Sequence, residues 1–395
     1  MDLSFETGAF LLLISAIVAM LVRRLRIPYS VGLVAAGIVV ALLPFSPQIS
    51  LTKELLFTVL LPPLIFDAAF QLNWRHLRAD LSPILVLATM GVGLSAVVTT
   101  VGMHYLVGWQ WLSALVFGVL IAATDPVSVI ATFKEAKAQG RLLLLVESES
   151  LFNDATAAVL FAICLQLVLG RVPTPFGVSA QLVMITGGSL VCGAAVAGAV
   201  LLLMGHTDDH LVEITFTTVA AYGSFLLAEH FHLSGVLATL VAGLMLGNIG
   251  SLGVISDRGR EAVETFWEYA AFVANSLVFL LIGMREARQS FASGWSAIVI
   301  AILLVTLARA VAVYPCCAMY ARSSLRVSMR HQHVLFWGGL RGALALALAL
   351  ALPADMPQRE SIVRVSFAVV AFSIFVQGLT LAPLLRKSGE IPRAR

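Results

Sequence analysis

A cluster of acidic and amide residues lies in the first half of a stretch that is hydrophobic over most of its length, residues 141–170. The cluster consists of Glu147, Glu149, Asn153 and Asp154. The stretch is long enough to cross a bilayer, and an ionised group in hydrocarbon is costly, so such residues normally face protein or a water-filled cavity. The cluster is therefore a candidate ion-binding site. An amphipathic helix of a soluble protein is the alternative interpretation, but the rest of the chain offers little water-soluble mass to pack against it.

Helical spacing divides this cluster between two faces. Ser150 and Asp154 are four residues apart and share one face, whereas Glu149 and Asn153 share a neighbouring face. A carboxylate and a hydroxyl are hard oxygen ligands, which suit a cation. Burial disfavours the charged form of a carboxylate and a bound cation favours it, so Asp154 can hold a proton or a metal ion but not both. This competition predicts exchange of a cation for protons.

The composition is that of an integral membrane protein. Of the 395 residues, 59% are hydrophobic and 12% are charged, whereas a typical soluble domain is about 25% charged. Apolar runs of about 20 residues recur along the chain, which favours helices over a barrel. The net charge is only +3 and the basic residues form no patch, so nothing indicates nucleic acid. The four cysteines show no disulfide or metal spacing, and no cofactor is expected.

We predict an all-α polytopic membrane protein, a single transport domain over residues 1–395, with about thirteen transmembrane segments. The predicted segments are 6–22, 28–45, 52–72, 81–107, 111–133, 142–169, 178–204, 211–229, 233–250, 264–284, 292–320, 332–352 and 361–385. Lys and Arg concentrate in the connections after odd-numbered segments. The positive-inside rule then predicts an outside N-terminus and a cytoplasmic C-terminus in the cell's inner (plasma) membrane.

Two of these segments are interrupted near their middles. The fifth contains Pro126 directly after Asp125, and the twelfth contains Arg341 among three glycines. Both features weaken a helix, and broken helices at membrane depth line a cavity or are buried in protein. If segment seven is a connector, segments five and twelve correspond in two inverted six-helix repeats, and paired interruptions of this kind predict a transport site at the interface of the repeats. Two unrelated kinks are the alternative interpretation.

Arg341 needs a counter-charge inside the membrane. Glu149 is the predicted partner, with Asn153 hydrogen-bonded to the pair. Breaking a buried ion pair costs about 3–5 kcal/mol, so we expect this cluster to have a structural role. Arg309 also lies in an apolar segment, and its partner, an acid or main-chain carbonyls, is left open.

Further oxygen ligands come from other segments. A dehydrated Na⁺ at Asp154 and Ser150 needs more oxygens, which Thr124 and the unwound backbone beside Asp125 can supply. Asp125 fits a structural acid beside the break equally well. Asp67 lies nearer the cytoplasmic end of its segment, where it is either a second-sphere ligand or a solvated end residue.

Taken together, the motifs resemble the electroneutral sodium/proton exchangers with an Asn-Asp pair, within the monovalent cation:proton antiporter family. The resemblance covers nearly the whole chain. It lies in FDAAF at 66–70, ATDPVSV at 123–129, ESLFNDATA at 149–157 and GGLRGALALALAL at 338–350.

The resemblance implies a homodimer in the lipid membrane that works by elevator-like alternating access. It implies a mobile core of segments within 81–170 and 292–385, in which the discontinuous fifth and twelfth helices cross, beside a dimerisation scaffold of 1–80 and 171–291. The implied cation and proton site consists of Asp154, Ser150, Asp125, the Thr124 carbonyl and Asp67. The implied stabilising cluster consists of Glu149, Asn153 and Arg341. Asp67 departs from the pattern, because some prokaryotic relatives carry Glu there.

The sequence therefore predicts a secondary antiporter, not an enzyme, that exchanges Na⁺, Li⁺ or K⁺ for H⁺. Because Asn153 stands where a second acid would add a charge, we expect one-for-one, electroneutral exchange. Two alternatives stay open. One is an intramembrane aspartyl protease that uses two of Asp67, Asp125 and Asp154, and the other is a passive cation channel.

Overall fold

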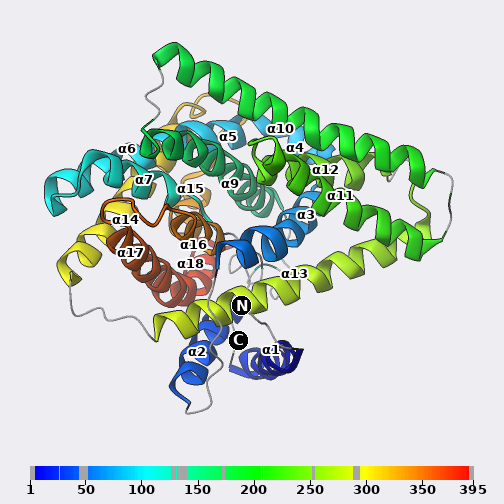
Figure 1. Ribbon diagram of the computed structural model, residues 1–395, viewed down its shortest axis with the longest axis horizontal. Helices are drawn as coiled ribbons and strands as arrows, with labels where there is room; N and C mark the ends of the chain where they lie inside the picture. Colours follow the sequence, from blue (N-terminus) through cyan, green and yellow to red (C-terminus); the bar gives the residue numbers. More distant parts are fainter. Residues whose placement is uncertain are drawn as a thin grey trace. The chain divides into compact units, whose positions relative to one another are not determined.

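The chain folds almost entirely into helices, as the computed structural model shows (Figure 1). The structure describes residues 5–25, 27–43, 52–125, 130, 133, 140–170, 174–205, 207, 209–250, 254–287 and 294–390. In these ranges no strand occurs, and the one extended feature is an isolated bridge between Asp125 and Leu340. The predicted all-α class is confirmed.

The helices follow the apolar segments of the sequence. In chain order they are α1 (Phe5–Leu25), α2 (Tyr29–Leu42), η1 (Leu55–Leu60), α3 (Leu61–Gln71), α4 (Trp74–Ala79), α5 (Leu81–Val86), η2 (Leu87–Gly91), α6 (Val92–Gly102), η3 (Met103–Val107), α7 (Trp111–Leu120), α9 (Arg141–Val168), α10 (Pro175–Met204), α11 (His210–His230), α12 (Gly235–Ile249), α13 (Asp257–Glu286), α14 (Trp295–Ala318), α15 (Met329–Gly338), α16 (Ala343–Leu350), α17 (Arg359–Phe372), η5 (Ser373–Gly378) and α18 (Leu379–Ser388), where η denotes a π-helix. Among the described residues, seven continuous helices are long and apolar enough to cross a membrane. The number of crossings and their orientation stay predictions.

Contacts between residues divide the chain into two compact units. The first consists of Met1–Lys53, Ser82–Asn153 and Ser276–Arg395, and the second of Glu54–Leu81 and Asp154–Asn275. Helices α9 and α13 each contribute residues to both units. The assignment of a mobile core and a scaffold stays a prediction.

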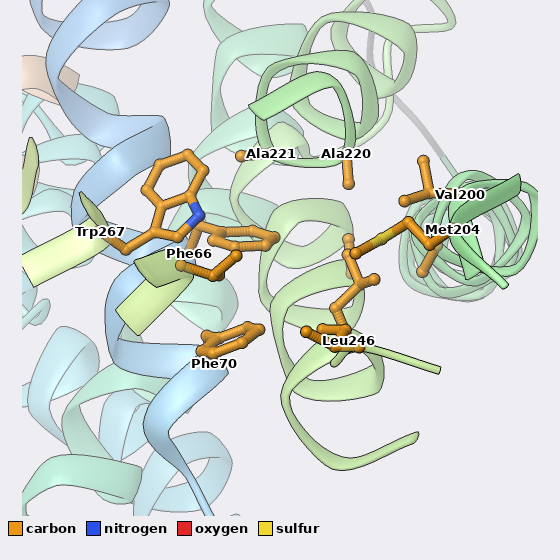
Figure 2. Packing of buried hydrophobic residues seen from close by; sticks show 12 residues of the cluster. Phe66, Phe70, Val200, Met204, Ala220, Ala221, Leu246 and Trp267 are labelled. Carbon is orange, nitrogen blue, oxygen red and sulfur yellow. The ribbon is translucent and has the colours of Figure 1, made fainter. Parts of the chain in front are cut away.

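The second unit has an aromatic core between its helices. The Trp267 ring of α13 lies 4.5 Å from the Phe66 ring of α3, and its indole N–H donates to Thr217 Oγ1 at 3.0 Å. Figure 2 shows these rings beside apolar side chains of α10, α11 and α12, and the three green helices lie side by side in Figure 1. The buried cluster consists of Phe66, Phe70, Ala197, Val200, Met204, Ala220, Ala221, Ala242, Leu246, Ile255, Val263 and Trp267.

Glycines allow α12 to approach α3 closely in this unit. A Cβ atom at Gly247 would overlap the carbonyl oxygen of Phe70, and one at Gly243 would press on Ala69. Neither backbone nor a short side chain can move aside cheaply, so these two positions require a residue without a side chain.

We therefore expect Gly247→Ala to lower the thermal unfolding midpoint in detergent, because overpacking of this kind costs about 1–3 kcal/mol. Gly198→Ala on α10 is the matched control, since a Cβ there meets no atom within 4 Å. The control should keep or slightly raise the midpoint, because alanine favours helix. Equal midpoints for the two variants would contradict the close packing of α12 on α3.

Helix α14 organises the first unit. It packs along α6 and η2 and also contacts α15 and α17, while α16 contacts α7 and α17. Both predicted interruptions are present in this unit. Helix α7 ends at Leu120, and residues 123–125 are not helical. Helix α15 ends at Gly338 and α16 begins at Ala343. Pro126, which was predicted to cause the first break, lies outside the described residues.

Candidate functional site

The two interrupted segments meet at their breaks in the first unit. The Asp125 N–H donates to the Leu340 carbonyl at 2.7 Å, which forms the antiparallel bridge. The Arg341 side chain reaches across, and its Nη1 donates to the carbonyls of Ala122 at 2.7 Å and Ala123 at 3.1 Å. These carbonyls lie in the non-helical segment after α7, and buried main-chain carbonyls of this kind need a donor from elsewhere in the chain. The breaks of the fifth and twelfth segments therefore meet, whereas most of segment five beyond Asp125 lies outside the described residues and the inverted repeats stay a prediction.

Two glycines make this contact sterically possible. A Cβ atom at Gly342 would overlap the carboxyl group of Asp125, and a Cβ at Gly339 would press on the guanidinium of Arg309. The glycines therefore do more than weaken the helix. They leave space for charged side chains that approach from other segments.

Thr124 is held by two side chains of α9. Its N–H donates to Asn153 Oδ1 at 3.0 Å, and its hydroxyl accepts from Asn153 Nδ2 at 2.7 Å. The same hydroxyl donates to Ser150 Oγ at 3.2 Å, and the Ser150 hydroxyl donates to the Thr124 carbonyl. All three residues are buried. The donors and acceptors of this network follow a consistent order, in which each of the two hydroxyls accepts one hydrogen bond and donates another, and this fixes the unwound backbone against α9.

Glu149 forms a two-pronged ion pair with Arg309 of α14. The distances from Nη1 and Nη2 to the two carboxylate oxygens are 2.8 and 2.9 Å, and both side chains are buried. Arg309 also donates to the Leu335 carbonyl of α15 from Nε at 3.2 Å and from Nη2 at 2.9 Å. Asn153 Nδ2 completes the cluster with a hydrogen bond to Glu149 Oε1 at 3.2 Å. The pair thus joins α9, α14 and α15.

The prediction that Arg341 forms the ion pair with Glu149 is corrected by this geometry. Packing of α14 against α15 brings Arg309 to the carboxylate, whereas Arg341 Nη1 donates to main-chain carbonyls beyond α7. From the sequence, Arg309 needs a partner, which is either an acid or main-chain carbonyls. In the structure it has both, the Glu149 carboxylate and the Leu335 carbonyl. The predicted hydrogen bond of Asn153 to the cluster is present.

The remaining predicted site residues are on α9 and α3. Asp154 lies one helical turn beyond Ser150 on α9 and is partly buried. Asp67 on α3 is also partly buried and accepts a hydrogen bond from Gln71 Nε2 at 2.7 Å. Both aspartates belong to the second unit. The structure therefore brings Thr124, Ser150 and Asn153 into one network in the first unit, with Asp154 on the continuation of the same helix.

A narrow cavity adjoins the Thr124 network. Its walls consist of Thr124, Val146, Glu149, Ser150, Arg309, Leu335, Gly338 and Gly339. Within the described ranges, no group of three or more His, Cys, Asp or Glu side chains is placed to hold a metal ion. The polar groups that line it are the hydroxyls of Thr124 and Ser150 and the ion pair of Glu149 with Arg309.

Known proteins resemble this chain over nearly its whole length. A family model described as "Sodium/hydrogen exchanger, transmembrane" matches residues 10–387. The Na(+)/H(+) antiporter ApNhaP of Aphanothece halophytica is 38% identical, over 93% of this chain and 70% of the relative. The Na(+)/H(+) antiporter NhaH of Halobacillus dabanensis is 34% identical, over 96% of this chain and 97% of the relative.

A solved structure shares the fold. The sodium proton antiporter MjNhaP1 from Methanocaldococcus jannaschii, determined at pH 8, aligns with a TM-score of 0.78 over 97% of both chains. The sequence identity in this alignment is 19%. The arrangement of helices is thus common to both proteins, although most of their side chains differ.

Proposed function

Because the chain belongs to the transmembrane sodium/hydrogen exchanger family and is a Na⁺/H⁺ antiporter, we propose that Asp154 is the group at which the cation and the proton compete. The observation that carries this proposal is the Thr124 network, which fixes hard oxygen donors one helical turn before Asp154. The two alternatives, an intramembrane protease and a passive channel, are set aside because the family and the relatives are antiporters.

The proposed cation ligands are Asp154, Ser150, Asp125 and the Thr124 carbonyl, with Asp67 as a further acid. The Ser150 hydroxyl now donates to the Thr124 carbonyl. A cation held by both oxygens would replace this hydrogen bond, since the hydroxyl hydrogen must turn away from the ion. A proton on Asp154 removes the negative charge that attracts the cation, which favours release. Alternating exposure of the site to the two sides would then exchange the ions.

The Glu149 cluster has a different role in this proposal. Glu149 is neutralised by Arg309, and its carboxylate accepts hydrogen bonds from both Arg309 and Asn153. It therefore keeps its charge during transport and holds α9 against α14 and α15. Asn153 carries no charge and uses its amide to position Thr124. Among these neighbouring residues of α9, Asp154 is therefore the one with an exchangeable charge, which supports a stoichiometry of one to one.

One-for-one exchange moves no net charge across the membrane. We expect Na⁺-driven proton flux in proteoliposomes to proceed at the same rate whether the membrane voltage is zero or is clamped by a K⁺ gradient with valinomycin. A rate that changes with the clamped voltage would contradict the stoichiometry. The same assay with Li⁺ and K⁺ in place of Na⁺ would establish which cations the site accepts.

The family relationship also supports the larger organisation that we propose. The chain would be a homodimer in the plasma membrane with its N-terminus outside. Segments within 81–170 and 292–385 would move as a core against a scaffold of 1–80 and 171–291. The transported ions are the only small ligands that this mechanism needs.

A further inference from the structure

The hydroxyl of Ser373, the first residue of η5, has an unusual partner. Serine and threonine inside helices commonly donate back to the carbonyl four residues earlier. Ser366 does so with Ile362 at 2.8 Å, and Thr380 does so with Val376 at 2.6 Å. Ser373 instead accepts a hydrogen bond from the Arg341 N–H at 2.8 Å and donates to Gln377 Oε1 at 2.8 Å. Its hydroxyl therefore links η5 to the distant segment that contains Arg341.

The Arg341 N–H needs this acceptor. Arg341 lies in the non-helical link between α15 and α16, two residues before the first residue of α16, and its N–H donates to Ser373 Oγ instead of taking part in a helix. Arg341 is 2% exposed and Ser373 is 1% exposed, so bulk water cannot replace the bond. A buried N–H without an acceptor carries a free-energy penalty. Ser373 therefore fixes the position of the α15–α16 link along η5.

The contact continues to the proposed cation site. The Arg341 side chain holds the carbonyls of Ala122 and Ala123, which directly precede Thr124. A shift of the Arg341 backbone would therefore move the segment that carries the Thr124 carbonyl. Ser373 lies outside that site and reaches it only through Arg341.

The surroundings of Ser373 indicate that its contact with Arg341 is a specific part of the structure. Residues Ser373–Gly378 form one of the π-helices of the described chain, and such local widenings often occur at functional sites. A small cavity beside it is lined by polar groups from α14, from the link and from η5, namely Thr306, Arg309, Arg341, Ser373 and Gln377. Gln377 is 7% exposed and orients the serine hydroxyl, so that the lone pairs of Ser373 face Arg341.

We propose that Ser373 is a positioning residue for cation binding, because it anchors the Arg341 backbone and thereby fixes the Thr124 carbonyl. The inference rests on the proposed function of the Thr124 site. Ser373→Ala would remove the hydroxyl that accepts from the Arg341 N–H, and the link would then fluctuate. The cation would bind a less ordered set of oxygens, while the charge and the proton chemistry of Asp154 would be unchanged.

The test compares three variants of the full-length protein in proteoliposomes. We expect Ser373→Ala to raise the apparent KM for Na⁺ about five- to tenfold, the factor that loss of one buried hydrogen bond gives, with the maximal rate per folded transporter nearly unchanged. Ser366→Ala is the matched control, because Ser366 is equally buried but bonds only within its own helix. Ser373→Thr keeps a hydroxyl and should restore the KM.

Amide hydrogen exchange gives a readout that does not depend on transport. Peptides covering residues 338–343 should exchange faster in Ser373→Ala than in the wild type or in Ser366→Ala. Where Ser373→Ala does not fold, Gln377→Leu is the substitute, since it removes the acceptor that orients the hydroxyl, and it should change KM in the same direction.

The outcomes are separable. A wild-type protein that exchanges no ions would overturn the proposed function itself. Wild-type exchange together with an unchanged KM in Ser373→Ala would overturn the positioning role alone, even if the amide exchanges faster. A KM that rises equally in Ser366→Ala would also overturn it, because the effect would then be a general loss of helix packing.

Discussion

Asp154→Asn is expected to reduce Na⁺-dependent proton flux to the level of protein-free liposomes. Asparagine has nearly the same shape as aspartate, but it can neither bind and release a proton in this pH range nor offer a negative charge to a cation. Both halves of the proposed competition are therefore lost in one substitution. Flux is measured with a pH-sensitive dye in proteoliposomes after addition of Na⁺, and the thermal unfolding midpoint shows whether the variant is folded.

A conservative control separates this effect from a general loss of carboxylates. Asp209 caps the N-terminus of α11 through a 2.9 Å hydrogen bond from the Leu211 N–H, and its side chain is 58% exposed. Asp209→Asn keeps the capping oxygen and should exchange ions at the wild-type rate. Retained exchange in Asp154→Asn would remove Asp154 from the mechanism and would place the competition at another acid.

Glu149→Gln is expected to lower the free energy of unfolding strongly. The substitution leaves the buried guanidinium of Arg309 without its counter-charge, and breaking a buried pair in this way costs about 3–5 kcal/mol. Arg309→Met leaves the Glu149 carboxylate unpaired and should cost a similar amount. The double variant removes both charges and should be far more stable than the sum of the two losses predicts. Unfolding in detergent by heat or denaturant gives the three values.

Two controls are available for this double-mutant cycle, an exposed ion pair on α13 and the second buried arginine, Arg341. Arg260 and Glu264 form an exposed pair one turn apart on α13 at 2.9 Å, and Glu264→Gln should cost only about 0–1 kcal/mol. A second cycle, with Arg341→Met in place of Arg309→Met, should give a smaller coupling energy with Glu149 than the first cycle gives. Additive losses of Glu149→Gln and Arg309→Met would contradict the ion pair seen here.

Local features of the sequence determined the fold class and the α9 part of the site. Apolar runs of bilayer length can satisfy their backbone in hydrocarbon only as helices, so composition alone predicted an all-helical membrane protein. The neighbours on α9 were also predictable, because residues four apart meet on any helix. Glu149 and Asn153 meet in this way. The interruption near Arg341 followed from its glycines.

Tertiary structure alone decided which distant groups meet. Glu149 and Arg309 are 160 residues apart, and Arg341 and Ala122 are 219 apart. Both arginines lie in apolar segments, so composition and periodicity gave each the same need for a partner. The packing of α14 on α15 directs Arg309 to the carboxylate. Ser373 carried no sequence signal, because a buried serine in a helix ordinarily bonds to its own turn, and only the approach of the broken segment turns its hydroxyl toward Arg341.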